Sequence, residues 1–183
     1  MDFLEEEYFY HIFNRGNNKQ NIFFEKENYE YFLRLLEKHI CPVAKIYSYC
    51  LLSNHFHLLI QIKKGAINPS QKFSNFFNSY TKSINKKYNR TGSLFQKPFK
   101  RIRVIDSEYL FQLVTYIHLN PEKHGVLNGF EKYQYSSFSM FLNNRSSSFI
   151  ETKEVLEWFD GITNFEFVHY QRRPFEEKNL LLE

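Results

Sequence analysis

The sequence predicts an α+β protein with a ferredoxin-like antiparallel sheet, helices packed on one face, and a C-terminal extension. Strand-like and helix-like segments alternate in the order β, α, β, β, α, β, α, which favours helices gathered on a central antiparallel sheet. The length of 183 residues suits one domain, or one domain with an appendage. We expect a core over residues 1–124 and an extension packed on that core over residues 125–183.

The first half of the chain contains a strand, a helix and a hairpin. Residues 8–24 combine a strand, a polar turn and a short apolar return. Residues 25–39 place apolar side chains at helical spacing, and a proline then ends the helix. Residues 43–51 and 55–62 are strand-like and are joined by a short turn, which predicts an antiparallel hairpin.

The second half continues with a helix, a strand and another helix. Pro69 opens a predicted helix over residues 69–89. A further strand is expected within residues 94–105, and the next helix over residues 108–119. The tail is less periodic and contains one predicted helix, residues 152–159. These segments complete the order that the fold class requires.

A long stretch of the chain, from Lys38 to Ile105, contains no Asp or Glu in 68 residues. Thirteen of the 24 basic residues lie in this stretch, so the rest of the chain has a net charge of −9. Such a block predicts a polyanionic partner, because each Lys or Arg at a phosphate releases a counterion. The alternative is a solvated face with an accidental charge bias.

The remaining composition indicates a cytoplasmic protein. Cys41 and Cys50 offer neither a disulfide framework nor a zinc-type spacing. The acidic N-terminus lacks the apolar segment of a signal peptide, and no apolar run has the length of a membrane span. The 21 Phe and 13 Tyr are mainly expected in the core, although some could stack on unpaired bases.

His55 and His57 form a candidate metal site at the start of a predicted strand. Residues two apart on a strand point to the same face, so the two imidazoles lie side by side while Phe56 faces the core. Neutral imidazoles on a rigid strand can bind a divalent ion and leave positions open for substrate oxygens. Two histidines without a metal are the alternative, because the pattern alone is weak.

Tyr116 and Asn120 form a second candidate site on a predicted helix. Four residues apart, they lie on the same helical face. The phenol oxygen could attack phosphorus, and the amide oxygen could complete a ligand set. Alternatively, Tyr116 is an aromatic at the edge of the core and Asn120 caps the helix before Pro121. Tyr109 shares roughly the same face and is the rival nucleophile.

These motifs together resemble the single-tyrosine HUH transposases, in particular their REP-associated tyrosine transposase branch. Residues 54–60 (NHFHLLI) and 116–121 (YIHLNP) carry the resemblance. Supporting matches are residues 11–16 (HIFNRG), 92–96 (GSLFQ) and 135–138 (YSSF). The resemblance covers roughly residues 8–140, and this ordered set is far more specific than either motif alone.

The resemblance implies a transposase-like endonuclease and strand-transferase that acts on single-stranded DNA, including hairpin-forming repeats. It implies Mg²⁺ or Mn²⁺ held by His55 and His57, with Asn120 as third ligand. It also implies that Tyr116 cleaves DNA through a 5′-phosphotyrosine. Phe56 replaces a usually smaller apolar residue and Ser53 a common proline, neither in contact with the chemistry. A monomer and a homodimer are equally compatible with the sequence, as are an active transposase and a domesticated copy.

The basic stretch supplies candidate DNA contacts. The predicted DNA-binding residues are Arg15, Lys97, Lys100, Arg101 and Arg103. Because alternate strand residues face opposite sides, we expect Arg101 and Arg103 to act as a pair and Lys100 to matter less. The rival functions are a non-catalytic single-stranded nucleic-acid-binding module and a metal-dependent phosphodiesterase that uses activated water.

Overall fold

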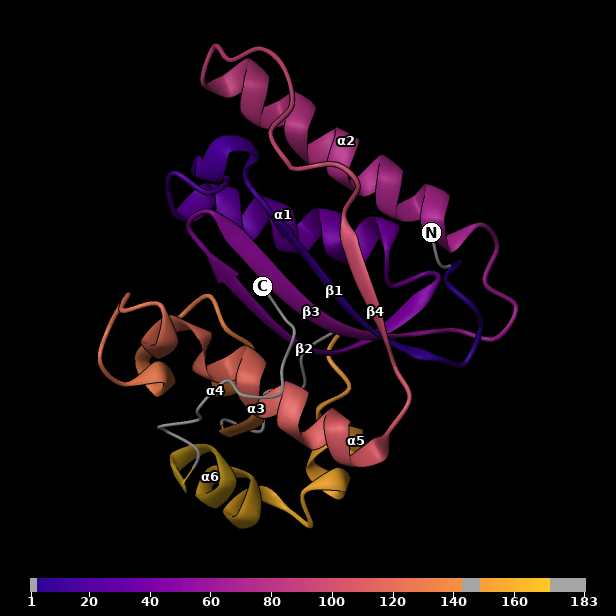
Figure 1. Ribbon diagram of the computed structural model, residues 1–183, viewed down its shortest axis with the longest axis vertical. Helices are drawn as coiled ribbons and strands as arrows, with labels where there is room; N and C mark the ends of the chain where they lie inside the picture. The colour runs from indigo at the N-terminus through magenta and orange to yellow at the C-terminus, as the bar shows by residue number, and fades with distance from the viewer. Residues whose placement is uncertain (1–2, 143–148, 172–183) are drawn as a thin grey trace.

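A computed structural model describes residues 3–142 and 149–171 of the chain. A central sheet separates two groups of helices, with α1 and α2 on one side and α3 to α6 on the other (Figure 1). The last part of the expected extension, residues 172–183, lies outside the described residues. No described helix is both long and apolar enough to cross a bilayer.

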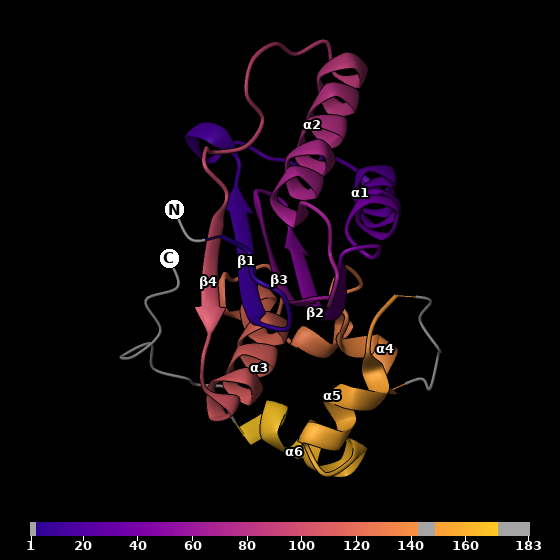
Figure 2. The ribbon, with the colours of Figure 1, turned by 90° about the vertical axis from the view of Figure 1, so that its right-hand side faces the viewer.

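The sheet consists of β1 (Phe9–Arg15), β2 (Ala44–Leu52), β3 (His55–Ile62) and β4 (Lys100–Val104). Its order is β2-β3-β1-β4, and every neighbouring pair is antiparallel. Consecutive strands β2 and β3 form the expected hairpin, whereas the connections through helices place β1 and β4 beside non-consecutive strands. This topology confirms the predicted ferredoxin-like α+β class. The expectation that the helices lie on one face is wrong, because helices cover both faces of the sheet (Figure 2).

The helices α1 (Lys26–His39) and α2 (Pro69–Lys87) cover one face of the sheet (Figure 2). Aromatic side chains fill the space between these helices and the sheet. The Phe56 ring lies 5.1 Å from the ring of Phe32 on α1 and 5.8 Å from that of Phe77 on α2. Phe56 therefore points away from the two histidines that flank it, as the alternation of a strand requires.

The helix α3 (Ser107–Lys123) packs on the opposite face of the sheet and is longer than expected. It continues past Leu119 and through Pro121, so the interpretation of Asn120 as a helix cap is wrong. Although proline cannot donate a backbone hydrogen bond, the Asn120 amide bonds the carbonyl of Tyr116 at 2.8 Å within this last turn. The helix ends at Lys123, and the chain turns at Gly125, whose φ of +63° is favourable for glycine.

The segment after α3 wraps around the edge of the sheet and lies beneath α3 (Figure 2). Its elements are η2 (Phe130–Lys132), α4 (Phe138–Leu142), α5 (Thr152–Trp158) and α6 (Ile162–Gln171). A short 3₁₀ turn, η1 (Asn17–Lys19), follows β1.

Backbone bridges join the post-α3 segment to the β2 edge, pairing Ser136 with Cys50 and Ile150 with Ile46. The described part of the expected extension is thus packed tightly on the core.

Candidate active site

The two histidines of β3 lie on the sheet face that α3 covers. Across the β1–β3 pair, His57 is opposite Phe13 and His55 is opposite Arg15. Both histidines are buried, with 8% of His55 and 2% of His57 exposed. The strand therefore places the two imidazoles side by side, as the HFH spacing predicts.

Each imidazole has one ring nitrogen engaged by a neighbouring side chain. His55 Nδ1 lies 2.6 Å from Asn54 Oδ1, and His57 Nδ1 lies 2.9 Å from His11 Nε2. An amide oxygen can only accept, so His55 carries its proton on Nδ1 and has its lone pair on Nε2. The Nε2 atoms of His55 and His57 are both buried without a hydrogen-bond partner.

Burial keeps these imidazoles neutral. It lowers the pKa of His55 from 6.5 to about 3, with smaller contributions from the charges of His124, Arg15 and Lys123. Burial also lowers the pKa of His57 well below its usual value, and that of His11 to about 3. Neutral imidazoles have the lone pairs that metal ligation requires.

The helix α3 presents one face to the histidine pair. The Tyr116 ring lies 5.6 Å from the His57 ring and perpendicular to it, and the His124 ring lies 4.6 Å from the His55 ring. Asn120 is halfway between Tyr116 and His124, and residues four apart share a helical face. Asn120 therefore faces the same pair, with its Oδ1 buried and without a hydrogen-bond partner.

This arrangement fits a divalent ion of the Mg²⁺ or Mn²⁺ type. Three buried acceptors without partners, His55 Nε2, His57 Nε2 and Asn120 Oδ1, come from two elements that pack together. Outer hydrogen bonds from Asn54 and His11 fix the ring orientations, as is usual around metal ligands. Among the described residues there is no group of three His, Cys, Asp or Glu that could hold a metal, so the third ligand would be the amide oxygen.

Tyr116 is closer to the histidines than its rival Tyr109. Lys123 Nζ lies 3.5 Å from the Tyr116 hydroxyl and 4.6 Å from the centre of its ring. Tyr109 is half-buried, and burial raises its pKa. Within the described residues, no ring contact joins Tyr109 to His55 or His57. The geometry favours Tyr116 as the reactive tyrosine.

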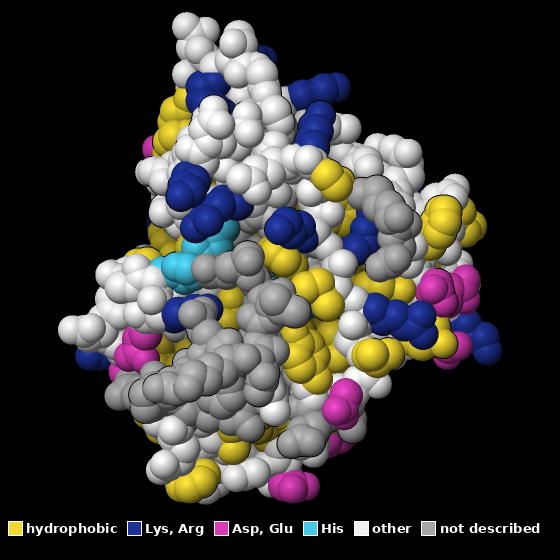
Figure 3. Space-filling view, in the orientation of Figure 1, with side chains coloured by type: hydrophobic (Ala, Val, Ile, Leu, Met, Phe, Trp, Pro, Cys, Tyr) yellow, Lys and Arg dark blue, Asp and Glu magenta, His cyan; other side chains and the backbone are white. Residues whose placement is uncertain are grey.

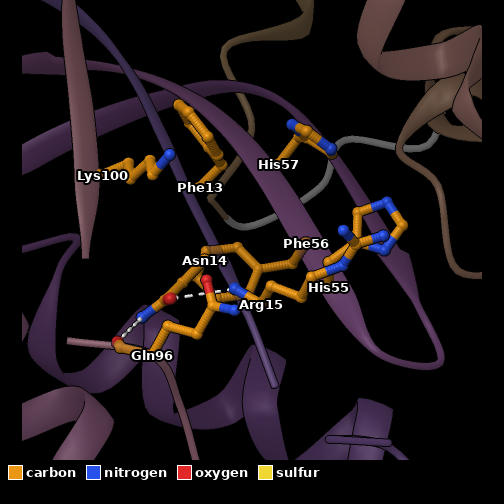
Figure 4. Close-up of a pocket in the computed structure, with 8 residues that line it drawn as sticks. All are labelled: Phe13, Asn14, Arg15, His55, Phe56, His57, Gln96 and Lys100. Carbon is orange, nitrogen blue, oxygen red and sulfur yellow. Dashed lines mark hydrogen bonds between the residues drawn. The ribbon is translucent and has the colours of Figure 1, made fainter. Parts of the chain in front are cut away.

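A small pocket of about 80 Å³ opens beside the histidines (Figure 4). Its lining comprises Phe13, Asn14, Arg15, His55, Phe56, His57, Gln96 and Lys100. Asn14 donates to the Gln96 carbonyl at 3.2 Å, which ties β1 to the segment before β4. The predicted DNA contacts Arg15 and Lys100 therefore stand at the site itself.

Arg101 and Arg103, two other predicted DNA contacts, lie on the opposite face of the sheet. Arg101 stacks on Phe99 at 4.5 Å and donates to Ser70, while Arg103 lies over Tyr8 and pairs with Glu5 at 3.4 Å. Lys100, not the two arginines, lines the histidine pocket.

A larger groove of about 770 Å³ continues from this pocket and runs along α2. The two cavities share Asn14 and Gln96. Polar, aromatic and basic groups in its lining include Ser70, Ser74, Asn78, Thr81, Lys97, Phe99 and Arg101. Histidine side chains reach the surface in the middle of the molecule, with Lys and Arg side chains beside them (Figure 3).

Sequence reasoning missed three residues of the site: His11, Lys123 and His124. His11 is four residues before Arg15, so strand alternation places both on the face of the histidine pair. His124 follows Asn120 by four residues, the same spacing that joins Asn120 to Tyr116. The helical pattern would have revealed His124 had the helix not been expected to end before Pro121.

Fold and site together define a class: ferredoxin-like α+β proteins in which a helix presents a tyrosine to a pair of histidines on a strand. The chain belongs to the IS200-like transposase family, whose family model matches residues 5–120.

Two relatives support this assignment. The chain is 28% identical over 99 residues to a Haemophilus influenzae protein named as a REP-associated tyrosine transposase. That match spans 49% of this chain and 56% of the relative, so the chain spans about half of the relative's length. It is also similar, with a TM-score of 0.67, to a solved REP-associated tyrosine transposase bound to a REP hairpin. That similarity covers 78% of this chain and 83% of the other at 15% identity, and it shows the fold alone.

Proposed function

We propose that this chain is a metal-dependent tyrosine transposase that cleaves and rejoins single-stranded DNA through a 5′-phosphotyrosine on Tyr116. The observation that carries the proposal is the meeting of Tyr116 and Asn120 on α3 with His55 and His57 on β3. A purely structural histidine pair would bond its ring nitrogens, whereas here both Nε2 atoms are buried without partners.

The reaction conserves the number of phosphoester bonds. The Tyr116 oxygen attacks the scissile phosphorus, the new O–P bond forms, and the bond from phosphorus to the 3′ oxygen breaks. The phenol proton passes to solvent, and the departing 3′ oxygen takes up a proton. A free 3′-OH can reverse the same steps and join a new strand, because the phosphotyrosine retains the ester.

Lys123 supports the tyrosine in both directions. Its ammonium donates to the Tyr116 oxygen at 3.5 Å. A cation at this position stabilises the negative charge that develops on the phenol oxygen as nucleophile or as leaving group. The metal ion, held by His55, His57 and Asn120, would supply Lewis-acid stabilisation of the phosphate.

The substrate we propose is single-stranded DNA that carries a hairpin-forming repeat. The solved relative was captured with a REP hairpin, and the stretch from Lys38 to Ile105 of this chain contains thirteen Lys or Arg and no Asp or Glu. Arg15 and Lys100 line the histidine pocket and would bind phosphates next to the scissile bond. The groove along α2, with Lys97 and Arg101 in its lining, would receive an unpaired segment of the strand.

The direct test is incubation of the protein with Mn²⁺ and an end-labelled single-stranded hairpin, followed by denaturing electrophoresis. We expect a labelled protein band that resists denaturant and disappears when the metal is chelated. Cleavage without such a band would indicate a phosphodiesterase that uses activated water. Binding without cleavage would indicate a non-catalytic nucleic-acid-binding module.

A further inference from the structure

A second group of buried histidines lies on the opposite side of α3, away from the proposed active site. His118 of α3 and His169 of α6 are both fully buried. His118 Nδ1 lies 2.9 Å from His169 Nε2, and His118 Nε2 lies 2.8 Å from the hydroxyl of Ser137. His169 Nδ1 lies 2.7 Å from the Phe165 carbonyl. Every ring nitrogen of this group therefore has a partner.

When both rings are neutral, the hydrogen bonds of this group can be oriented in one direction only. A carbonyl can only accept, so His169 donates from Nδ1 and accepts at Nε2. His118 then donates from Nδ1, and its Nε2 accepts from the Ser137 hydroxyl at 2.8 Å, a shorter contact than the 3.3 Å from that hydroxyl to the Tyr49 carbonyl. Ser137 Oγ also accepts from the backbone N–H of Tyr49 on β2, at 2.9 Å. One continuous hydrogen-bonded chain thus connects α6, α3 and β2.

The remaining ring contacts of His118 are with phenylalanine side chains. The rings of Phe138, Phe141 and Phe165 lie within 5.9 Å of the His118 ring. An apolar shell tolerates small shifts of a helix, whereas a fully satisfied polar network specifies a single arrangement. The hydrogen bonds through His118 and Ser137 therefore link α3 to β2, the hairpin partner of the strand that carries the histidine pair.

The position of His118 within α3 links this chain to the site. His118 lies midway between Tyr116 and Asn120, two residues from each. At about 100° per residue it lies on the side of the helix away from both. Any rotation or shift of α3 at His118 would move Tyr116 and Asn120 together relative to His55 and His57.

We propose that His118, together with Ser137 and His169, is a positioning residue that holds α3 in the register at which Tyr116 and Asn120 meet the histidine pair. The segment after α3 would then be an integral part of the catalytic apparatus. This inference rests on the proposed function for its consequence in catalysis, but the geometry it claims can be measured without activity.

The experiment compares His118→Phe and His118→Gln with wild type. Phenylalanine fills a similar volume without hydrogen bonds, whereas glutamine keeps one donor and one acceptor. Ser137→Ala is the milder second variant in case His118→Phe does not fold. Val155→Ala, which shortens a buried side chain on α5, is the matched control for general destabilisation. The readouts are the ring-to-ring NOE between Tyr116 and His57, and Mn²⁺ affinity by calorimetry.

We expect His118→Phe and Ser137→Ala to weaken the Tyr116–His57 NOE and to lower Mn²⁺ affinity by roughly 10- to 100-fold, as is typical for supports of metal ligands. His118→Gln should recover most of both signals, and Val155→Ala should retain them even where its melting temperature falls. An unchanged NOE in folded His118→Phe or Ser137→Ala overturns the positioning role. Wild-type protein that shows the NOE but binds no Mn²⁺ contradicts the proposed function instead, and the NOE still decides the positioning role.

Discussion

Two buried histidine clusters lie on either side of α3, and they differ in what their ring nitrogens contact. In the cluster of His118 and His169, every ring nitrogen has a hydrogen-bond partner. In the cluster of His11, His55 and His57, each ring has one nitrogen that is buried without a partner. Burial lowers the pKa of His11, His55 and His57 in one cluster and of His118 in the other, so charge does not separate the two clusters.

The hydrogen bonding of the ring nitrogens therefore distinguishes structural histidines from candidate reactive ones. A buried polar atom without a partner costs about 1–3 kcal/mol, and a fold tolerates that cost where the atom has another use. The cluster around His118 joins secondary structures and is complete. The cluster around His57 has ring nitrogens without partners, and the proposed active site rests on that difference.

The largest expected effect separates the two candidate tyrosines. Tyr116→Phe should abolish the covalent adduct while leaving the fold and DNA affinity nearly unchanged, because only one hydroxyl is lost. Tyr109→Phe is the matched control on the same helix and should remain active. Denaturing gels with labelled hairpin DNA and anisotropy binding measure the two properties. Loss of the adduct in the Tyr109 variant instead would reassign the nucleophile.

The metal ligands should be distinguishable from their supports. His55→Ala and His57→Ala should each remove Mn²⁺ binding and metal-dependent cleavage. Asn120→Ala should be weaker because it removes one neutral oxygen ligand. His11→Phe, which deletes an outer hydrogen bond, should cost roughly 10- to 100-fold in Mn²⁺ affinity. Calorimetry that shows undiminished Mn²⁺ binding by the His57 variant would rule out this site.

The positive charge of Lys123 should accelerate the reaction of Tyr116 through direct contact with its oxygen. Lys123→Met should slow adduct formation by roughly 100-fold, because a donor to the developing phenolate charge is lost. Lys132→Met removes the same charge from an exposed position on η2 and should have little effect. Single-turnover rates at saturating DNA give the comparison. Equal rates for the two variants would show that Lys123 contributes only general attraction.

Both histidine clusters should make the free energy of unfolding depend on pH. The pKa of His11 and of His55 is lowered from 6.5 to about 3, and that of His118 is also lowered. Between pH 6.5 and 3 the unfolded chain therefore binds these protons and the folded protein does not, so the free energy of unfolding falls as the pH falls.

Each such histidine contributes about 1.4 kcal/mol per pH unit to this dependence. His118→Gln removes one contribution and should flatten the slope by that amount. Denaturant unfolding at several pH values measures it, and an identical slope in the variant would contradict the neutral, buried state of His118.

The smallest expected effect concerns phosphate contacts. Lys100→Ala should weaken binding to all single-stranded sequences about equally and reduce the log–log salt slope by roughly 0.7, the value for one lost phosphate contact. Arg103→Ala should change the slope less, because Arg103 pairs with Glu5 on the other face. Anisotropy at several salt concentrations tests this, and the reverse ranking would place the DNA on the face of Arg103.

Much of the fold followed from local patterns. The strand predicted over residues 55–62 has those bounds in the structure, and helices predicted over 25–39 and 69–89 differ by one or two residues at their ends. The helix α6 was not predicted, because exposed Phe167 and Tyr170 obscure the apolar periodicity around buried Phe165.

Half of the site was also evident from spacing. The HFH strand and the Tyr116–Asn120 helix each bring two side chains together locally. The meeting of strand and helix could not be derived from spacing, because it depends on packing across the sheet. Pro121 hid the final turn of α3, and with it Lys123 and His124. That turn persists because tertiary packing and the Asn120–Tyr116 bond outweigh the loss of one backbone donor.

The central claim is that chemistry occurs where α3 meets the incompletely bonded histidine cluster. The most direct test is mass spectrometry of the protease-digested adduct formed with Mn²⁺ and a single-stranded hairpin. We predict a peptide in which Tyr116 is esterified to the 5′-phosphate of a nucleotide, and no such species in Tyr116→Phe. Modification of Tyr109 instead, or cleaved DNA with no modified tyrosine, would contradict the account.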